Sequence, residues 1–317
     1  MARKISRRSF IKESTAIGVG SLVGASVITG FAGEPGNLLY AGGKIDISVV
    51  EGENYFKNTI KAVKQLGGMK HFVPKNSKVA ILANPQRNNP GAYTRPDIVA
   101  AAIRMCKDAG AKEVTCISWL PLENWENTGL KKAVDTEGAK LVIVNLRDES
   151  LFKPVPVPKG KALKEARIMK EFFNYDLLID IPITKDHAGN KFTGTLKNLM
   201  GLNSPQNNRT FHKPNWKTDI NDIRHLDQSI ADLNTVITPV LCIVDATEFI
   251  ITNGPFGPGK LHKPNQVVAG VDRVAVDAYC STLWGLEPKN IITITQAHEH
   301  QLGQIDLEKV KIKKISG

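Results

Sequence analysis

Short apolar runs alternate along the chain with stretches that carry apolar residues every three to four positions. An apolar run of four to eight residues is typical of a buried strand, and the 3.6-residue period is typical of a helix with one buried face. Strands are therefore predicted over residues 45–50, 79–83, 113–117, 141–145, 177–183, 240–244 and 266–269. Helices are predicted over residues 58–66, 96–109, 130–137, 220–234 and 273–284.

The segment 79–117 is the clearest unit of this pattern. Pro96 suits the first turn of a helix and Gly110 suits its left-handed end, so the segment is predicted as strand, loop, helix and strand. Such units build parallel sheets, and binding groups gather in the loops after the strands. We therefore predict an α/β fold, a mostly parallel sheet flanked by helices, in a single large domain over residues 44–317. The proline-rich segment 152–164 is predicted to be an edge or a connection, because proline has no N–H to donate.

Residues 1–32 form a segment of a different kind. Arg7 and Arg8 precede an uncharged, small and apolar stretch over residues 14–32, a pattern typical of a twin-arginine export signal. The signal predicts passage through the Tat translocase and a periplasmic or other extracytoplasmic location. A retained membrane anchor is the alternative, but the glycine, serine and threonine content favours cleavage between residues 32 and 41.

The charge of the chain limits the kinds of partner. The whole chain carries a formal net charge of +11, and the part after residue 32 carries +7. This modest excess is explained by solubility alone or by a small anionic ligand, and both interpretations stay open. Because lysine and arginine are not interleaved with aromatic residues, a nucleic-acid partner is not expected. The oligomeric state is not predicted.

The cysteines are widely separated and show no C-x-x-C spacing, which argues against a zinc or iron–sulfur site. They are Cys106, Cys116, Cys242 and Cys280, and each lies in an apolar run. Buried, unpaired thiols are expected, because free cysteine packs like a small hydrophobic residue. A disulfide stays open as an alternative in an oxidising compartment.

The loop after the second predicted strand offers groups for an anion. It begins at Asn84 and ends in Thr94 and Arg95, directly before the helix that starts at Pro96. A helix start presents free backbone N–H groups and the positive end of the dipole, and the Thr94 and Arg95 side chains add donors there. The alternative is that Thr94 only caps the helix and Arg95 is a solvated charge.

The richest segment follows the predicted strand 177–183. It contains Lys185, His187, Lys197, Arg209 and His212. Imidazoles act as acids, bases or metal ligands near neutral pH, and a lysine in an apolar pocket or near another cation can act as a nucleophile. The alternative for each histidine is a structural role, with a ring nitrogen bonded to a backbone carbonyl.

Other polar residues are predicted to be structural. Asp272 suits the N-cap of the last predicted helix, and Asp277 lies within that helix. His298 and His300 are two positions apart near a helix end, which is poor geometry for a shared metal, so both are expected on the surface. The loop 253–259 is rich in glycine and proline but lacks the helix context of a phosphate-binding loop.

The order of these pieces resembles the DUF362 family, a group of α/β proteins without a settled activity. The resemblance runs from Asn84 to Trp284 and rests on strings that are specific together. They are Thr94 with Pro96, Ala109-Gly110-Ala111, Lys185 with His187, Lys197-Asn198-Leu199 with Gly201, Arg209, His212, Val244-Asp245-Ala246, Gly254-Pro255 with Gly257, Ala269-Gly270-Val271-Asp272 and Val276-Asp277-Ala278. The chain departs from the family in having Ala83 where a lysine is frequent. It also lacks the cysteine-rich insertions of many members, so no iron–sulfur cluster is expected.

A fainter likeness is to the N-terminal domain of nickel-pincer lactate racemases. In that family a Thr-Arg-Pro helix start holds a cofactor phosphate, a lysine bears the nucleotide, and histidines bind nickel and move protons. The positions that look similar are Thr94-Arg95-Pro96, His187, Lys197 and His212. Ser118 and Trp119 stand where the second proton-moving histidine would fall, so racemisation by two bases is not expected.

Three hypotheses follow. In the leading one the protein holds a cofactor of unidentified kind, with a metal ion or a metal nucleotide as candidates. It assigns His187 and Lys185 as catalytic groups, Asn84, Thr94, Arg95 and Lys197 as cofactor-binding groups, and His212 with His187 as metal ligands. In the second, a non-catalytic binding protein captures a small anionic ligand. In the third, the basic residues only satisfy buried partners. The leading hypothesis requires these side chains to converge on one cavity.

Overall fold

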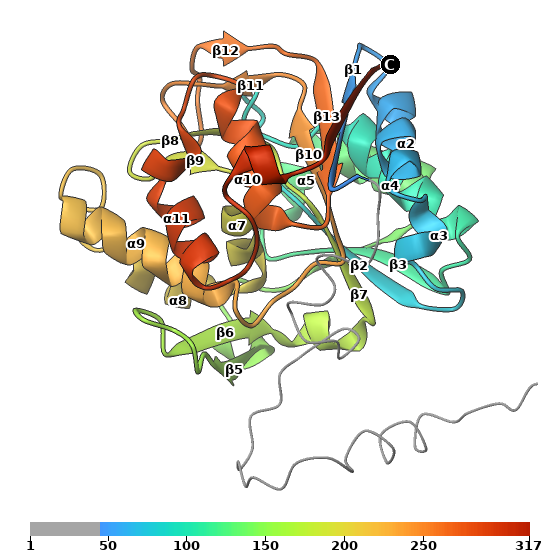
Figure 1. Ribbon diagram of the computed structural model, residues 1–317. Helices are drawn as coiled ribbons and strands as arrows, with labels where there is room; N and C mark the ends of the chain where they lie inside the picture. The colour runs from blue at the N-terminus through green and yellow to red at the C-terminus, as the bar shows by residue number, and fades with distance from the viewer. Residues whose placement is uncertain (1–44) are drawn as a thin grey trace, which may run out of the picture.

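A computed structural model describes residues 45–317, and the predicted export signal lies outside them. Its centre is an eight-stranded sheet with the order β14-β1-β13-β10-β7-β2-β3-β4 (Figure 1). The strands are β1 (Ile47–Glu51), β2 (Lys78–Ala83), β3 (Glu113–Ser118), β4 (Lys140–Ile143), β7 (Leu177–Ile181), β10 (Leu241–Ala246), β13 (Gln266–Gly270) and β14 (Ile312–Ser316). Within this sheet β13 alone runs antiparallel to its neighbours, so the predicted mostly parallel sheet is confirmed.

Helices cover both faces of the sheet (Figure 1). The first face carries α2 (Tyr55–Gln65), α3 (Met69–Phe72), α4 (Pro96–Asp108), α5 (Leu122–Asn127) and α6 (Leu130–Thr136). The second face carries α7 (Thr195–Asn198), α8 (Pro205–Phe211), α9 (Ile220–Leu233), α10 (Arg273–Thr282) and α11 (Ile292–Glu299). The α/β architecture predicted from the alternating pattern is therefore confirmed.

The central strands read as continuous apolar runs because both of their faces are buried. In β2, Val79 and Ile81 pack in the core of the first face, whereas Ala80 and Leu82 pack in the core of the second. Successive side chains of a strand point to opposite faces, so a strand between two helix layers needs apolar residues at every position.

Smaller elements pack on the second face of the sheet. Three two-stranded sheets pair β5 (Phe152–Pro156) with β6 (Glu165–Met169), β8 (Lys185–His187) with β9 (Lys191–Thr193), and β11 (Phe249–Ile250) with β12 (Leu261–His262). Single 3₁₀ turns are η1 (Glu149–Leu151), η2 (Lys170–Asn174), η3 (Leu199–Leu202), η4 (Pro288–Asn290) and η5 (Leu307–Lys309). The segment 152–164 thus lies outside the central sheet, as its prolines predicted.

The strand order positions the functional site. From β2 the chain moves outward through β3 to β4, and then returns to β7 on the other side of β2. The connections that leave β2 and β7 therefore diverge, which opens a crevice beyond the carboxyl ends of these strands.

Some expectations from the sequence need correction. The edge strand β14 was not predicted, α11 was expected only through a helix end near His298 and His300, and the prediction that His300 lies on the surface is wrong. α11 packs against α9, and the His300 side chain is only 6% exposed, with Nε2 2.7 Å from the Asp232 carboxylate. His298 is exposed, and the four cysteines are buried and unpaired, as predicted. No helix within residues 45–317 has the length and apolar composition needed to cross a membrane.

Candidate functional site

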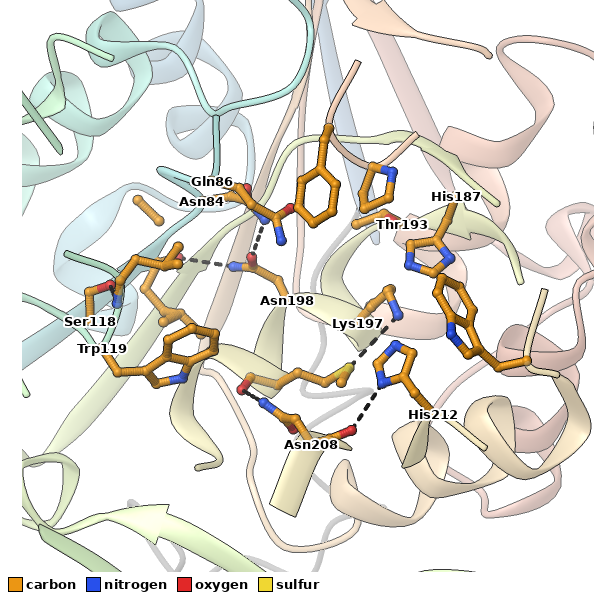
Figure 2. Close-up of a pocket in the computed structure, with 18 residues that line it drawn as sticks. Asn84, Gln86, Ser118, Trp119, His187, Thr193, Lys197, Asn198, Asn208 and His212 are labelled. Atoms are coloured by element: carbon orange, nitrogen blue, oxygen red, sulfur yellow. Dashed lines mark hydrogen bonds between the residues drawn. The ribbon is translucent and has the colours of Figure 1, made fainter. Parts of the chain in front are cut away.

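A cavity of about 260 Å³ lies beyond the carboxyl ends of β2 and β3 (Figure 2). One wall comes from the ends of these strands and the loops after them, with Leu82, Ala83, Asn84, Gln86, Ser118, Trp119 and Leu120. The opposite wall comes from β8, β9, α7 and α8, with His187, Thr193, Lys197, Asn198, Asn208 and His212. Met200, Trp216, Pro255 and Phe256 add apolar surface. The cavity therefore combines an apolar lining with a few polar groups, as small-molecule sites do.

Lys197 is the cation of this cavity. It lies on α7, and Figure 2 shows its side chain reaching toward the imidazoles of His187 and His212. Within residues 45–317 its Nζ makes one hydrogen-bond contact, at 3.8 Å from Met200 Sδ, and no carboxylate lies within salt-bridge distance of it. Burial lowers the pKa of Lys197 to about 8, against an opposing effect of the Asp227 carboxylate. The ammonium is thus partly buried without a paired anion.

The two imidazoles both contact Trp216. The ring centroids of His187 and Trp216 are 5.2 Å apart, and those of His212 and Trp216 are 4.8 Å apart. Burial together with the nearby Lys197 charge lowers the pKa of His212 to about 4 and that of His187 well below its ordinary value. Both rings are therefore neutral at physiological pH.

Backbone contacts select different tautomers for the two neutral rings. His212 Nδ1 donates to the Asn208 carbonyl at 2.9 Å, so its Nε2 keeps a free lone pair. The Gly189 N–H donates to His187 Nδ1 at 3.4 Å, so the proton of that ring lies on Nε2. One imidazole can therefore accept a hydrogen bond at Nε2, and the other can donate one.

Buried donors without a protein partner also line the cavity. Trp119 Nε1 and Thr193 Oγ1 are buried and have no hydrogen-bond partner among residues 45–317. A buried polar group costs free energy when it stays unpaired.

Comparison with known proteins identifies the family. The model of the "Domain of unknown function (DUF362)" matches residues 78–282, a range that spans the whole cavity. The chain belongs to the DUF362 family. Among curated proteins, this DUF362 chain is 24% identical over 272 residues to the thylakoid-associated protein sll1697 of Synechocystis sp. (strain ATCC 27184 / PCC 6803 / Kazusa), covering 81% of the chain and 79% of that protein.

Among solved structures, the chain is similar to the lactate racemase apoprotein from Thermoanaerobacterium thermosaccharolyticum. The TM-score is 0.44 and the sequence identity 14%, over 63% of this chain. The DUF362 chain spans about half the length of that racemase, because the match covers 51% of it.

The structure brings together only some of the predicted site residues. Asn84, His187, Lys197 and His212 line the same cavity, although up to 128 positions separate them. Thr94, Arg95 and Lys185 do not line it. The convergence expected from the sequence thus holds for the first four and fails for the other three.

The helix start before Pro96 holds a carboxylate of the protein itself. The Arg95 N–H donates to Asp245 Oδ2 at 2.7 Å, so this backbone group, which was expected to bind an external anion, is paired with a carboxylate of the protein. The Arg95 guanidinium turns to Thr247 Oγ1 at 2.7 Å and to Glu248 Oε1 at 3.3 Å. Thr94 is neither the cap nor a free donor, because its buried Oγ1 donates to the Ile181 carbonyl.

Lys185 lies behind the cavity wall. It is fully buried, and its Nζ donates to the Ala92 carbonyl at 2.6 Å, to Gln86 Oε1 at 3.1 Å and to Asn84 Oδ1 at 3.4 Å. Burial and the Lys197 charge lower its pKa to about 7. With all three N–H groups used inside the protein, Lys185 does not reach a ligand in the cavity.

The side chains that could bind a metal ion do not form a metal centre made of protein ligands alone. Within residues 45–317 no three histidine, cysteine, aspartate or glutamate side chains lie close enough to hold one metal ion. The cavity supplies the two imidazoles, and the helix start of the expected phosphate site is filled by Asp245. The residues present therefore do not fit a nucleotide whose phosphate binds at Arg95.

Sequence reasoning missed the aromatic part of the site. Trp216 was not singled out, and Trp119 was noted only as a replacement for a histidine, yet both line the cavity. Trp119 follows a predicted strand, which is a signal that could have found it. Trp216 lies between α8 and α9 in a segment without any regular pattern, and only the packing shows its place.

Proposed function

We propose that the cavity binds a small organic anion with an apolar body. The observation that supports this most strongly is the partly buried Lys197 ammonium without a paired carboxylate in the described part of the chain. A charge taken out of water is costly unless it is paired, so an anion beside Nζ would stabilise the folded protein.

The rest of the lining supports the same class of ligand. His187 Nε2 can donate to an oxygen of a carboxylate. Met200 and Phe256 offer apolar contact for the remainder of the molecule. The volume of about 260 Å³ is near the lower end of ligand sites, which favours a small molecule over a nucleotide.

Calorimetric titration with benzoate tests the proposal. We expect binding to the purified protein, and a loss of about ten- to hundredfold in affinity in Lys197→Met, because a hydrogen bond to a charged group contributes about 1.5–3 kcal/mol. Lys313→Met is the matched control, since Lys313 is exposed on the edge strand β14 and should leave the affinity unchanged. Acetate and inorganic phosphate in the same series distinguish an apolar anion from anions in general.

Ionic strength provides a second measurement. Binding through an ammonium should weaken as salt rises, and less steeply than binding to an exposed basic patch, because a partly buried pair is less screened. The proposal is wrong if none of the three anions binds, or if Lys197→Met binds benzoate as well as the unmodified protein does.

Acid–base chemistry on the bound anion is a second candidate. It is supported by His212, a neutral imidazole whose Nε2 lone pair has no partner among residues 45–317 and faces the same cavity as Lys197. Exchange of the methyl protons of bound acetate for deuterium from D₂O, followed by NMR, would test it: His212 Nε2 would take a proton from the methyl group and a deuteron would replace it, and His212→Asn is expected to abolish the exchange. Elemental analysis and intact mass of protein from its native host would show whether a metal or an adduct accompanies the site.

We also propose that the protein is exported by the twin-arginine route. Arg7, Arg8 and the apolar stretch 14–32 support this, and the Tat translocase would be the transient partner. A reporter fused after residue 44 should reach the periplasm of a suitable host, and replacing both arginines by lysine should keep it in the cytoplasm. Export that survives this change would overturn the proposal.

A further inference from the structure

Lys185 donates all three of its N–H groups to one loop. The acceptors are Ala92 O, Gln86 Oε1 and Asn84 Oδ1, and all of them lie between β2 and α4. Two of these residues, Asn84 and Gln86, form part of the cavity wall, whereas Lys185 itself stands behind that wall. The ammonium therefore touches the back of the surface that a ligand would meet.

The ammonium also sets the direction of the amide groups. Below pH 7 Lys185 is mainly an ammonium, which has three donors and no acceptor, so the side-chain oxygens of Asn84 and Gln86 turn toward it. The Gln86 amide is planar, and with Oε1 on Lys185 its Nε2 is left with no partner in the described structure. The wall consequently presents an NH₂ group at Gln86.

A directional chain of hydrogen bonds keeps the second amide in place. Asn84 Nδ2 donates to Asn198 Oδ1 at 3.1 Å, and Asn198 Nδ2 donates to Asp180 Oδ1 at 2.7 Å. The chain begins on a group that only donates and ends on a carboxyl oxygen, so each amide has one favourable orientation. Figure 2 shows Asn84 beside Asn198 on this side of the cavity.

We propose that Lys185 is a positioning residue that makes the Gln86 wall a hydrogen-bond donor surface and so selects an anionic ligand over its neutral isostere. The proposal rests on the proposed function, because it names a specificity determinant of the same site. Without the ammonium, the Gln86 amide is free to turn, and its oxygen would repel a carboxylate.

The test compares benzoate with benzamide, which has the same shape and no charge. The preference is the ratio of the two dissociation constants, measured by calorimetry for the unmodified protein, Lys185→Met, Gln86→Met and the double variant. We expect each single variant to lower the preference for benzoate about tenfold, and the double variant to lower it no further, because both changes remove the same donor. Lys313→Met is the control again.

Additive effects in the double variant would overturn the proposal, since they would mean that Lys185 acts by its charge and independently of Gln86. An unchanged preference in Lys185→Met would overturn it as well. If Lys185→Met does not fold, as judged by circular dichroism, Gln86→Met decides alone: benzoate affinity must fall more than benzamide affinity, and equal losses contradict the proposal. Failure of the proposed function gives a different result. Benzoate would then not bind to the unmodified protein, or its binding would not depend on Lys197.

Discussion

The Asp277 carboxylate accepts a hydrogen bond of 2.7 Å from the backbone N–H of Thr195, at the start of the helix that carries Lys197. The second oxygen of Asp277 accepts from the Leu196 N–H at 3.0 Å. Helix α10 thereby holds the four-residue helix α7, which is too short to be stable alone. A residue 80 positions away in sequence from Lys197 thus determines where the cation of the cavity lies.

Removing this cap should affect both stability and binding. We expect Asp277→Ala to lower the free energy of unfolding by about 2–4 kcal/mol, because two buried N–H groups lose their acceptor. Benzoate affinity should fall as well, since Lys197 follows the capped turn directly. Urea denaturation measures the first effect and calorimetry the second.

Asp148→Ala is a suitable control for this variant. Asp148 also caps a short turn through one N–H, that of Ser150, but at an exposed position. We expect a cost below about 1 kcal/mol and no change in binding. Equal costs for the two variants would show that the Asp277 cap has no special importance.

Arg95 provides a test of the corrected site. Since its guanidinium pairs with Glu248 and lies outside the cavity, Arg95→Met should leave benzoate affinity within about twofold and cost about 1 kcal/mol of stability or less. Calorimetry and thermal unfolding measure the two quantities. A loss of binding comparable to that of Lys197→Met would instead support the anion site expected from the sequence.

Stability should depend on pH through His212. The unfolded ring has a pKa near 6.5 and the folded one about 4, so between these values only the unfolded chain binds the proton. The free energy of unfolding is therefore not reduced by His212 well above pH 6.5. It decreases as the pH falls from 6.5 toward 4, because the unfolded chain is stabilised by the bound proton.

Comparison with His212→Asn isolates this contribution, because asparagine does not titrate and can still donate to the Asn208 carbonyl. We expect the stability of the unmodified protein relative to the variant to fall by about 2 kcal/mol from pH 6.5 to pH 4.5. Above pH 7 the difference should be constant. A difference that does not change with pH would mean that water solvates the ring in the folded state.

Tryptophan fluorescence should report occupancy of the cavity. Two of the four tryptophans, Trp119 and Trp216, line it, whereas Trp125 is fully buried in the core of the other face. We expect benzoate to change the emission of the unmodified protein and of Trp125→Phe, and to change it much less in the double variant of Trp119→Phe and Trp216→Phe. A response that persists in the double variant would place the ligand elsewhere.

The central sheet could be predicted from the sequence because its strands are buried on both faces and therefore read as unbroken apolar runs. The edge strand β14 was not predicted because an edge strand is open to solvent and need not be apolar throughout. Lys313 and Lys314 interrupt its apolar run. His300 was misjudged because its burial depends on the contact of α11 with α9, which no local pattern shows.

The succession of strands along the chain, and the polar residues that follow them, could be predicted from the sequence. These polar residues were expected to lie close together, since loops after parallel strands meet at one edge of a sheet. This was enough to select Asn84, His187, Lys197 and His212. The direction of each side chain was decided only by the folded structure. The Asp245 carboxylate reaches Arg95 across 150 positions and fills the helix start, and the Lys185 ammonium turns away from the cavity to three oxygens of a distant loop. A local pattern can indicate which residues carry chemistry, but pairing of buried charges and donors is settled by contacts between segments far apart in sequence.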